Sequence, residues 1–222
     1  MHILFDLDGT LTDPKEGIIN CIQFALAKLN IDIAQDVNLE SCIGPPLIDS
    51  FIDLCGDREQ AKNAIRFYRE RFSTVGLFEN KLYAGITACL DQLNERAHSI
   101  HVATSKPTIY AQRIIEHFGL SQYFGEVFGS NLDGSLSDKT ELLAHIIDHK
   151  NLDPKQTVMI GDRSFDIVGA RNNGVTPIGV LWGYGTEDEL SNAGAEILCS
   201  HPDQIYDNIY SEQSTKQHTF QD

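Results

Sequence analysis

The chain has 222 residues, which is enough for one substantial core with a smaller attached unit. Its 17 basic and 32 acidic residues leave a net charge of −15, which disfavours nucleic acid and anionic membranes as partners. The five cysteines lack metal-type spacing, so we expect reduced thiols and a cytoplasmic protein. Met1 leads directly into an apolar segment, and no apolar run is long enough to span a membrane. We therefore expect neither a signal peptide nor a membrane anchor. A monomer and a homodimer are both compatible with the sequence.

The first predicted element is a short apolar strand, residues 3–5, which ends in Asp6-Leu7-Asp8-Gly9-Thr10. Carboxylates and glycine suit a buried strand poorly, because Asp and Gly are depleted in strands and unpaired buried charges are costly. They suit a loop at the carboxyl end of a strand, where open α/β sheets bind ligands. In this position Asp6 could attack a phosphorus atom, and Asp8 could move protons to and from a leaving group.

The next segment, residues 14–81, carries helical spacing and no convincing strand. Apolar residues recur every three or four positions over 18–29 and again over 61–72. Between these helices, Gly44-Pro45-Pro46-Leu47 predicts a stiff loop, because proline fixes its own φ and restricts the residue before it. We therefore predict an all-helical insert at 14–81, and a core formed by 1–13 and 82–210.

The rest of the chain alternates strands with amphipathic helices. We predict buried parallel strands at 99–103, 157–160 and 177–181, with a possible edge strand at 197–199. Helical spacing is found over 111–118 and 142–147 between them. This alternation predicts an α/β fold with a doubly wound parallel sheet. The polar tail, 211–222, is expected to be disordered.

Polar residues with chemical potential follow the later strands. Thr104 and Ser105 come after the strand at 99–103 and before a helix start, where hydroxyls and backbone N–H groups bind anions. Asp162 and Asp166 come after the strand at 157–160. Lys139 lies in the first turn of a predicted helix, where its charge opposes the helix macrodipole, which suggests a positional role.

Together these residues make a set suited to phosphoryl transfer, whose catalysis is mostly positioning and charge stabilisation. The acidic chain would repel a phosphate substrate, so the site must supply its own positive charge. A divalent metal plus lysine is the simplest source. Mg²⁺ suits carboxylates and a phosphate together better than Ca²⁺, and Mn²⁺ would accept the same oxygen ligands.

The chain resembles the haloacid dehalogenase superfamily, in its phosphoglycolate phosphatase-like branch. Four family motifs occur in order, at Asp6-Leu7-Asp8-Gly9-Thr10, Thr104-Ser105-Lys106, Lys139 and Gly161-Asp162-Arg163-Ser164-Phe165-Asp166. The resemblance implies a metal held by the Asp6 carboxylate, the Asp8 backbone carbonyl and Asp162, with Asp166 farther out or bound through water. It also implies that Thr104 and Lys139 hold the phosphoryl oxygens and that Lys139 steadies Asp6.

The same resemblance implies a small helical cap at 14–81 and a small phosphorylated metabolite as partner, such as 2-phosphoglycolate or a nucleoside 5′-monophosphate. The loop at Gly44 is similar to the family's cap loop, and Glu16 and Arg69 lie where this branch often has polar residues facing the cleft. Lys106 and Arg163 are expected to be solvated. His98 and His101 flank a predicted strand, and we expect packing or surface roles for them.

Three functions remain open at this point. The first is a Mg²⁺-dependent phosphatase that forms an aspartyl-phosphate on Asp6. The second is a phosphotransferase, such as a sugar-phosphate mutase of the same superfamily, which shares every core residue. The third is a phospho-aspartate signalling module like a receiver domain. Three features argue against the signalling module: the chain is too long for one receiver domain, a receiver domain has no helical insert, and Asp6 follows the first strand and not a middle one.

Overall fold

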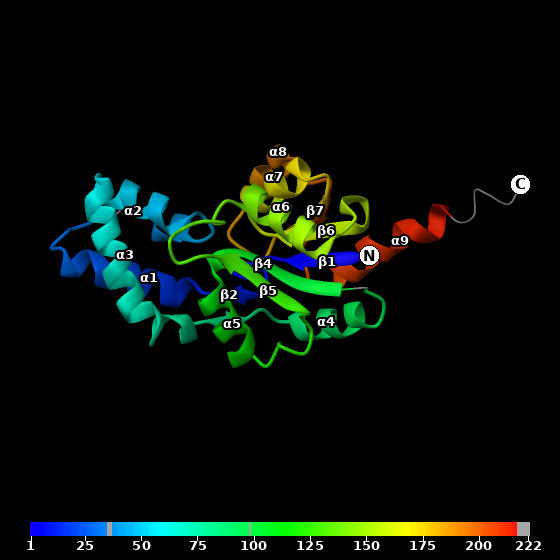
Figure 1. Ribbon diagram of the computed structural model, residues 1–222, viewed down its shortest axis with the longest axis horizontal. Helices are drawn as coiled ribbons and strands as arrows, with labels where there is room; N and C mark the ends of the chain where they lie inside the picture. The colour runs from blue at the N-terminus through cyan, green and yellow to red at the C-terminus, as the bar shows by residue number, and fades with distance from the viewer. Residues whose placement is uncertain (35–36, 98, 217–222) are drawn as a thin grey trace, which may run out of the picture.

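The computed structural model describes residues 1–34, 37–97 and 99–216, and its centre is a six-stranded parallel sheet (Figure 1). The predicted α/β class with a doubly wound parallel sheet is confirmed. The first strand lies inside the sheet and pairs in parallel with a strand on each side. In spatial order the strands are β5 (Glu126–Ser130), β4 (Ser99–Pro107), β1 (His2–Phe5), β6 (Thr157–Gly161), β7 (Thr176–Val180) and β8 (Ile197–Cys199).

Helices cover both faces of the sheet (Figure 1). Strand β1 explains why both faces must be covered. Ile3 and Phe5 pack into one hydrophobic cluster and Leu4 into the other, as alternation along a strand requires. The covering helices are α6 (Lys139–Lys150), α7 (Ser164–Asn172) and α8 (Glu187–Ala193) on one side, and α4 (Ile86–Asn94) and α5 (Thr108–His117) on the other. Helix α9 (Asp203–Lys216) packs on α4 and β8.

The insert between β1 and β4 is helical and lies beyond the carboxyl end of β1 (Figure 1). Its helices are α1 (Lys15–Lys28), α2 (Leu47–Cys55) and α3 (Arg58–Phe72). Both α1 and α2 pack on α3, and their buried residues continue the larger cluster of the core. The two crossings between insert and core are tied by a short antiparallel pair, β2 (Thr12–Asp13) and β3 (Lys81–Leu82). The sequence analysis expected no strand there.

Two further details differ from the sequence-based expectations. Strand β5 was missed, because it is a short edge strand in which only Val127 and Phe128 are large apolar residues. Strand β4 does not end at Ala103 but continues to Pro107, with a register irregularity against β5 between Thr104 and Pro107. Helix α5 begins at Thr108, directly after Pro107.

The C-terminal tail was expected to be disordered from residue 211. Helix α9 instead runs to Lys216, so the first six residues of that tail continue a helix. Residues 217–222 lie outside the described part of the chain. Within the described residues, none of the helices is both long and apolar enough to cross a lipid bilayer.

Candidate active site

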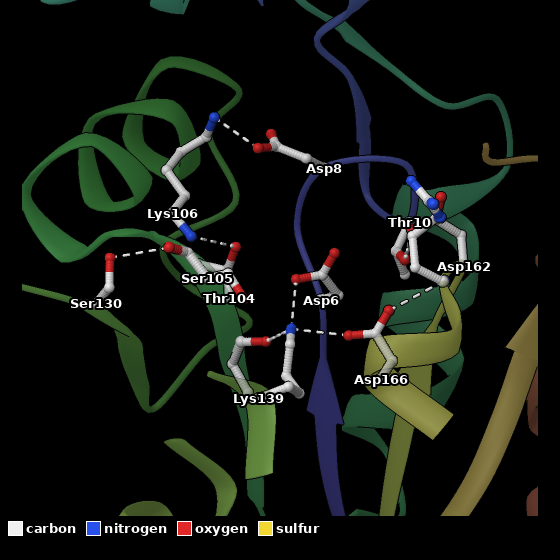
Figure 2. Close-up of polar contacts among 12 residues, drawn as sticks. Asp6, Asp8, Thr10, Thr104, Ser105, Lys106, Ser130, Lys139, Asp162 and Asp166 are labelled. Atoms are coloured by element: carbon white, nitrogen blue, oxygen red, sulfur yellow. Dashed lines mark hydrogen bonds and ion pairs between the residues drawn. The ribbon is translucent and has the colours of Figure 1, made fainter. Parts of the chain in front are cut away.

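Lys139 organises the centre of the site (Figure 2). Its Nζ donates to Asp6 Oδ1 at 2.8 Å and to the backbone carbonyl of Ala103 at 2.8 Å, and it lies 2.8 Å from Asp166 Oδ1. Burial alone would lower the pKa of Lys139, but the carboxylates of Asp166 and Asp6 outweigh it and raise the pKa above its ordinary value. The two carboxylates therefore favour the charged form of the lysine. The unfavourable charge in the first turn of α6 is explained by the two carboxylates that it faces.

Three carboxylates meet at the carboxyl end of β1 and β6. Asp6, Asp162 and Asp166 each offer an oxygen, and these oxygens all lie within 4.8 Å of one another. Burial, reinforced by the charges of Asp166 and Asp6, raises the pKa of Asp162 well above its usual range. Burial is also the main cause that raises the pKa of Asp166, against the lowering effect of Lys139. The cluster is thus short of positive charge.

Asp162 is held in place from two sides. One carboxylate oxygen accepts from the Thr10 hydroxyl at 3.3 Å, and the other accepts from the Tyr184 backbone N–H at 2.8 Å. Gly9 packs directly on this carboxylate, and a Cβ there would lie 2.2 Å from Asp162 Oδ2. Because Gly9 also has a φ of +86°, only glycine fits both the backbone and the space. Gly9 and Thr10 of the first motif therefore position the Asp162 carboxylate, Gly9 by close packing and Thr10 by a hydrogen bond.

Asp8 points away from this cluster, toward Lys106 (Figure 2). The ion pair between Lys106 Nζ and Asp8 Oδ2 spans 2.5 Å, while Asp8 Oδ1 is buried and has no hydrogen-bond partner among the residues that the structure describes. Burial raises the pKa of Asp8, and the charge of Lys106 opposes that rise. Lys106 was expected to be solvated. Its side chain is only 6% exposed, because Phe72 of α3 covers it with the ring centroid 4.7 Å from Nζ.

The two hydroxyl residues near the carboxyl end of β4, Thr104 and Ser105, lie on the opposite side of Asp6 from Asp162 (Figure 2). Thr104 is buried, and its hydroxyl oxygen accepts from the backbone N–H of Lys106 at 3.2 Å. The backbone carbonyl of Ser105 accepts from Ser130 Oγ of β5 at 2.8 Å. Ser130 was not anticipated, since the strand that carries it was missed.

One cavity between core and insert joins most of the predicted site residues. From the core it takes Asp6, Asp8, Thr104, Ser105, Lys139 and Asp166, and from the insert Gly44 and Arg69. Asp162 lies beside the cavity in the carboxylate cluster. Glu16 is the predicted residue that the structure does not bring there. It is exposed on the first turn of α1 and lines a separate hollow with Asp13 and Lys81, because the buried side of that turn is formed by Gly17 and Ile18.

Comparison with known proteins decides the family. The haloacid dehalogenase-like hydrolase family model matches residues 3–180. The chain belongs to the haloacid dehalogenase-like hydrolases. It is 48% identical over 190 residues to a Pseudomonas aeruginosa protein named 5′-nucleotidase, covering 85% of this chain and 86% of that protein. It is 35% identical to the Mycobacterium tuberculosis protein named tyrosine-protein kinase PtkA, covering 88% of this chain and 67% of that one.

Comparison with solved structures agrees with this family assignment. A crystal structure of a predicted phosphatase from Clostridium acetobutylicum matches with a TM-score of 0.90 and 41% identity, covering 95% of this chain and 98% of the other. Relatives and structural neighbours are named as phosphatases, so the hydrolase is an enzyme of the phosphoric monoester hydrolase class. The resemblance to the haloacid dehalogenase superfamily, expected from the four motifs, is confirmed.

The carboxylate cluster of the hydrolase fits a divalent cation. The four carboxylates of the site face two lysines, so two negative charges remain uncompensated when all six groups are ionised. The available metal-ligand atoms are carboxylate oxygens, which suit a hard cation such as Mg²⁺ or Mn²⁺. Asp6, Asp162 and Asp166 are the residues that could hold it. A cation with two positive charges would balance the site.

Arg163 of the hydrolase connects the core to the insert, although the sequence analysis expected it to be solvated. Its Nη1 donates to the Ile43 carbonyl at 2.5 Å, and its Nε pairs with Glu189 at 3.0 Å. Glu189 also accepts from the Ser164 backbone N–H at 2.8 Å. Gly44 packs on Arg163, and a Cβ at this position, where φ is +106°, would lie 2.9 Å from the arginine Cγ. The loop at Gly44 is therefore fastened to the core.

Of the two histidines considered in the sequence, His101 is buried in β4, and its ring packs edge-on against Phe128 with centroids 5.7 Å apart. Burial lowers the pKa of His101. It therefore has the packing role that was expected. His98 lies outside the described residues.

Proposed function

We propose that the protein is a Mg²⁺-dependent phosphatase that hydrolyses a small phosphomonoester through an aspartyl-phosphate on Asp6. The observation that carries the proposal is the position of Asp6. Its carboxylate lies in the cavity, bound to Lys139 on one side and next to the two other carboxylates of the cluster on the other. A phosphoryl group placed there would meet the nucleophile, the lysine and a cation together.

The chemistry takes two steps. First, an Asp6 oxygen forms a bond to phosphorus while the bond to the ester oxygen breaks, and Asp8 gives its proton to the departing alkoxide. Then Asp8 takes a proton from water, the water oxygen bonds to phosphorus, and the bond to Asp6 breaks to release phosphate. Thr104, Ser105 and Lys139 bind the phosphoryl oxygens during both steps. Burial of Asp8 favours its protonated form, as the first step requires.

When bound, Mg²⁺ neutralises charge on the phosphoryl group and on the carboxylates. Asp6 and Asp162 would hold the ion with the backbone carbonyl of Asp8, and Asp166 would support it from farther out. Asp166 already accepts a hydrogen bond from the Arg163 backbone N–H at 3.1 Å and pairs with Lys139. These contacts fix its carboxylate and favour a supporting role over direct binding.

Candidate substrates are 2-phosphoglycolate and nucleoside 5′-monophosphates. The relative named 5′-nucleotidase is 48% identical, whereas a Haemophilus influenzae relative named phosphoglycolate phosphatase is 27% identical. The insert at 14–81 would act as a cap that opens to admit substrate and closes to exclude water. Release of phosphate from a panel of metabolites, with Mg²⁺ and with EDTA, tests the proposal. Metal-dependent release supports it, and no release from any member would contradict it.

A phosphotransferase is the second candidate, because a relative at 35% identity is named a tyrosine-protein kinase. Such an enzyme would protect the aspartyl-phosphate from water until an acceptor other than water arrives. Time courses of released phosphate against phosphorylated or isomerised product distinguish the two. Phosphate that accounts for all consumed substrate would exclude the transferase.

A further inference from the structure

The leaving group of a substrate must lie in the same cavity, next to the phosphoryl group. Besides its charged residues, the cavity is lined by apolar and aromatic side chains, namely Ile18, Leu47, Tyr68, Phe72, Tyr110 and Phe165. A short polar leaving group such as glycolate would cover little of this surface. A planar, mostly apolar group would cover much more of it and gain the corresponding burial energy.

Four cations line the cavity, and three of them already have anionic or carbonyl partners. Lys139 binds Asp6 and Asp166, Lys106 binds Asp8, and Arg163 binds Glu189. Arg69 differs, because its Nε is buried and has no hydrogen-bond acceptor within the described part of the chain. A buried donor without a partner is costly, and the cost is relieved when a ligand supplies the acceptor. Arg69 is thus placed to donate to a bound molecule.

Phe165 supplies an independent observation. It is a wall residue of the cavity, and yet it is 43% exposed, which makes it one of the few large hydrophobic side chains left open to solvent. It extends from the first turn of α7, directly before Asp166, so it stands beside the phosphoryl site. The guanidinium of Arg163 lies over the ring, with Cζ 5.8 Å from the centroid, and the part of the ring that is open to solvent can stack with a planar ring in the leaving group.

We propose that Arg69 and Phe165 form a base-binding subsite, and that the leaving group is the nucleoside of a 5′-monophosphate. The base stacks on Phe165 and accepts a hydrogen bond from Arg69, and its ribose 5′-oxygen receives the proton from Asp8. This inference rests on the proposed phosphatase function and adds the substrate class and two specificity-determining residues to it. Purine and pyrimidine bases both carry ring nitrogens or carbonyl oxygens that accept from an arginine.

The test compares nucleoside 5′-monophosphates with ribose 5-phosphate, which has the same phosphate and sugar but no base. Values of kcat/KM are measured for the wild-type protein and for Arg69→Met, Arg69→Lys and Phe165→Leu. Arg66→Met is the matched control, because Arg66 is exposed on the same helix and lies over the Phe67 ring outside the cavity. Thermal melting shows that each variant is folded.

We expect the wild-type protein to prefer a nucleotide over ribose 5-phosphate, and Arg69→Met to reduce that preference by roughly 10- to 150-fold, the range for a hydrogen bond to a charged group. Phe165→Leu reduces it by about 5- to 150-fold, as for loss of a base–aromatic stack, mainly through KM. Arg69→Lys gives a smaller loss, and Arg66→Met leaves the preference unchanged.

Three outcomes are informative in different ways. Equal losses with nucleotide and ribose 5-phosphate would overturn the subsite, because Arg69 would then act on the phosphate or on the fold. A wild-type protein that hydrolyses ribose 5-phosphate or 2-phosphoglycolate as well as nucleotides would overturn the substrate class but leave the phosphatase standing. Only the absence of phosphate release from every compound would contradict the phosphatase itself.

Discussion

At the residue scale, Asp6 is the proposed nucleophile, and the charged form of its carboxylate is stabilised by the ion pair with Lys139. Replacing Asp6 by Asn keeps the shape of the side chain but removes the nucleophilic oxygen. We expect turnover to fall by a factor on the order of 10⁴ or more, as for loss of other enzyme nucleophiles. The substitution also removes one negative charge from a cluster with two uncompensated charges. The metal-free variant should therefore melt at the same temperature as the wild-type protein or higher.

Steady-state phosphate release and thermal melting in EDTA check both parts of this prediction. Asp138→Asn is a suitable control, because Asp138 is also acidic but is the exposed N-cap residue of α6. Its side chain accepts from the Glu141 backbone N–H at 3.0 Å. That variant should lose little activity. Substantial turnover by Asp6→Asn would show that another group attacks phosphorus.

A second residue-scale prediction concerns pH and metal. Burial raises the pKa of Asp162, and it raises the pKa of Asp166 to about 6. Such groups bind more protons in the folded than in the unfolded chain, so their contribution to stability is present at low pH and is lost as pH rises through the folded pKa. A cation needs the same carboxylates deprotonated and competes with these protons.

We therefore expect the rise in melting temperature caused by millimolar Mg²⁺ to be small near pH 5 and to grow toward pH 7.5. Calorimetry with Mg²⁺ and with EDTA across this range measures the effect. Asp162→Asn should greatly reduce the Mg²⁺ dependence of the melting temperature at every pH. A Mg²⁺ effect that is largest at pH 5 would contradict the assignment of the metal to this cluster.

At the scale of elements, Arg163 connects the loop at Gly44 in the insert to the core. Its side chain is held by Glu189 at 3.0 Å and donates to the Ile43 carbonyl. Arg163→Met removes this link, and we expect KM to rise by about tenfold, within the range for a hydrogen bond to a charged group. Because Asp6 and Asp8 are untouched, kcat should change less than KM. Amide hydrogen exchange over residues 39–47 should become faster.

Glu189→Gln provides the comparison for this prediction, since it weakens the anchor of Arg163 but leaves its bond to Ile43 possible. Its effect on KM should be smaller, and the double variant should resemble Arg163→Met alone, because the two residues act through one contact. Unchanged hydrogen exchange over 39–47 in Arg163→Met would show that the loop is held by other contacts.

The same scale shows how much the sequence could predict. Asp6, Thr104, Asp162 and Asp166 were predictable together, because the carboxyl ends of parallel strands meet at one edge of a sheet. Lys139 was predictable as a local misfit that tertiary contacts must explain. Strand β5 was not predictable from its pattern, since it is short, lies at an edge and contains glycine.

Residues between the core and the insert were harder to predict, because their environment depends on how these two parts of the chain pack together. Lys106 follows the predicted strand at 99–103 and was expected to be solvated, but Phe72 from the insert covers it. Arg163 is similar in that its partners, Ile43 and Glu189, are distant in the sequence. Glu16 was placed near the cleft by the resemblance to the family, which often has polar residues there. Its position in the first turn of α1 instead directs its side chain toward the separate hollow lined by Asp13 and Lys81.

At the scale of the whole molecule, the net charge of −15 opposes the capture of an anionic substrate. The cavity has local cations, but the surrounding field is negative, and salt screens the field more than the short contacts inside the cavity. We therefore expect kcat/KM for a phosphomonoester to rise, by roughly two- to fivefold, when NaCl is raised from about 20 to about 200 mM at constant Mg²⁺. The value of kcat should stay constant, since bound substrate has already crossed that field.

Two exposed aspartates offer a control for this salt effect. Asp148 on α6 and Asp207 on α9 lie outside the cavity, and replacing both by Lys would change the net charge from −15 to −11. The double variant should have a higher kcat/KM at low salt and a weaker dependence on salt, because less of the repulsion remains to be screened. If kcat/KM instead falls with salt in both proteins, the cations of the cavity dominate the approach of substrate. In that case the acidic surface has no part in substrate capture, and its contribution is to solubility alone.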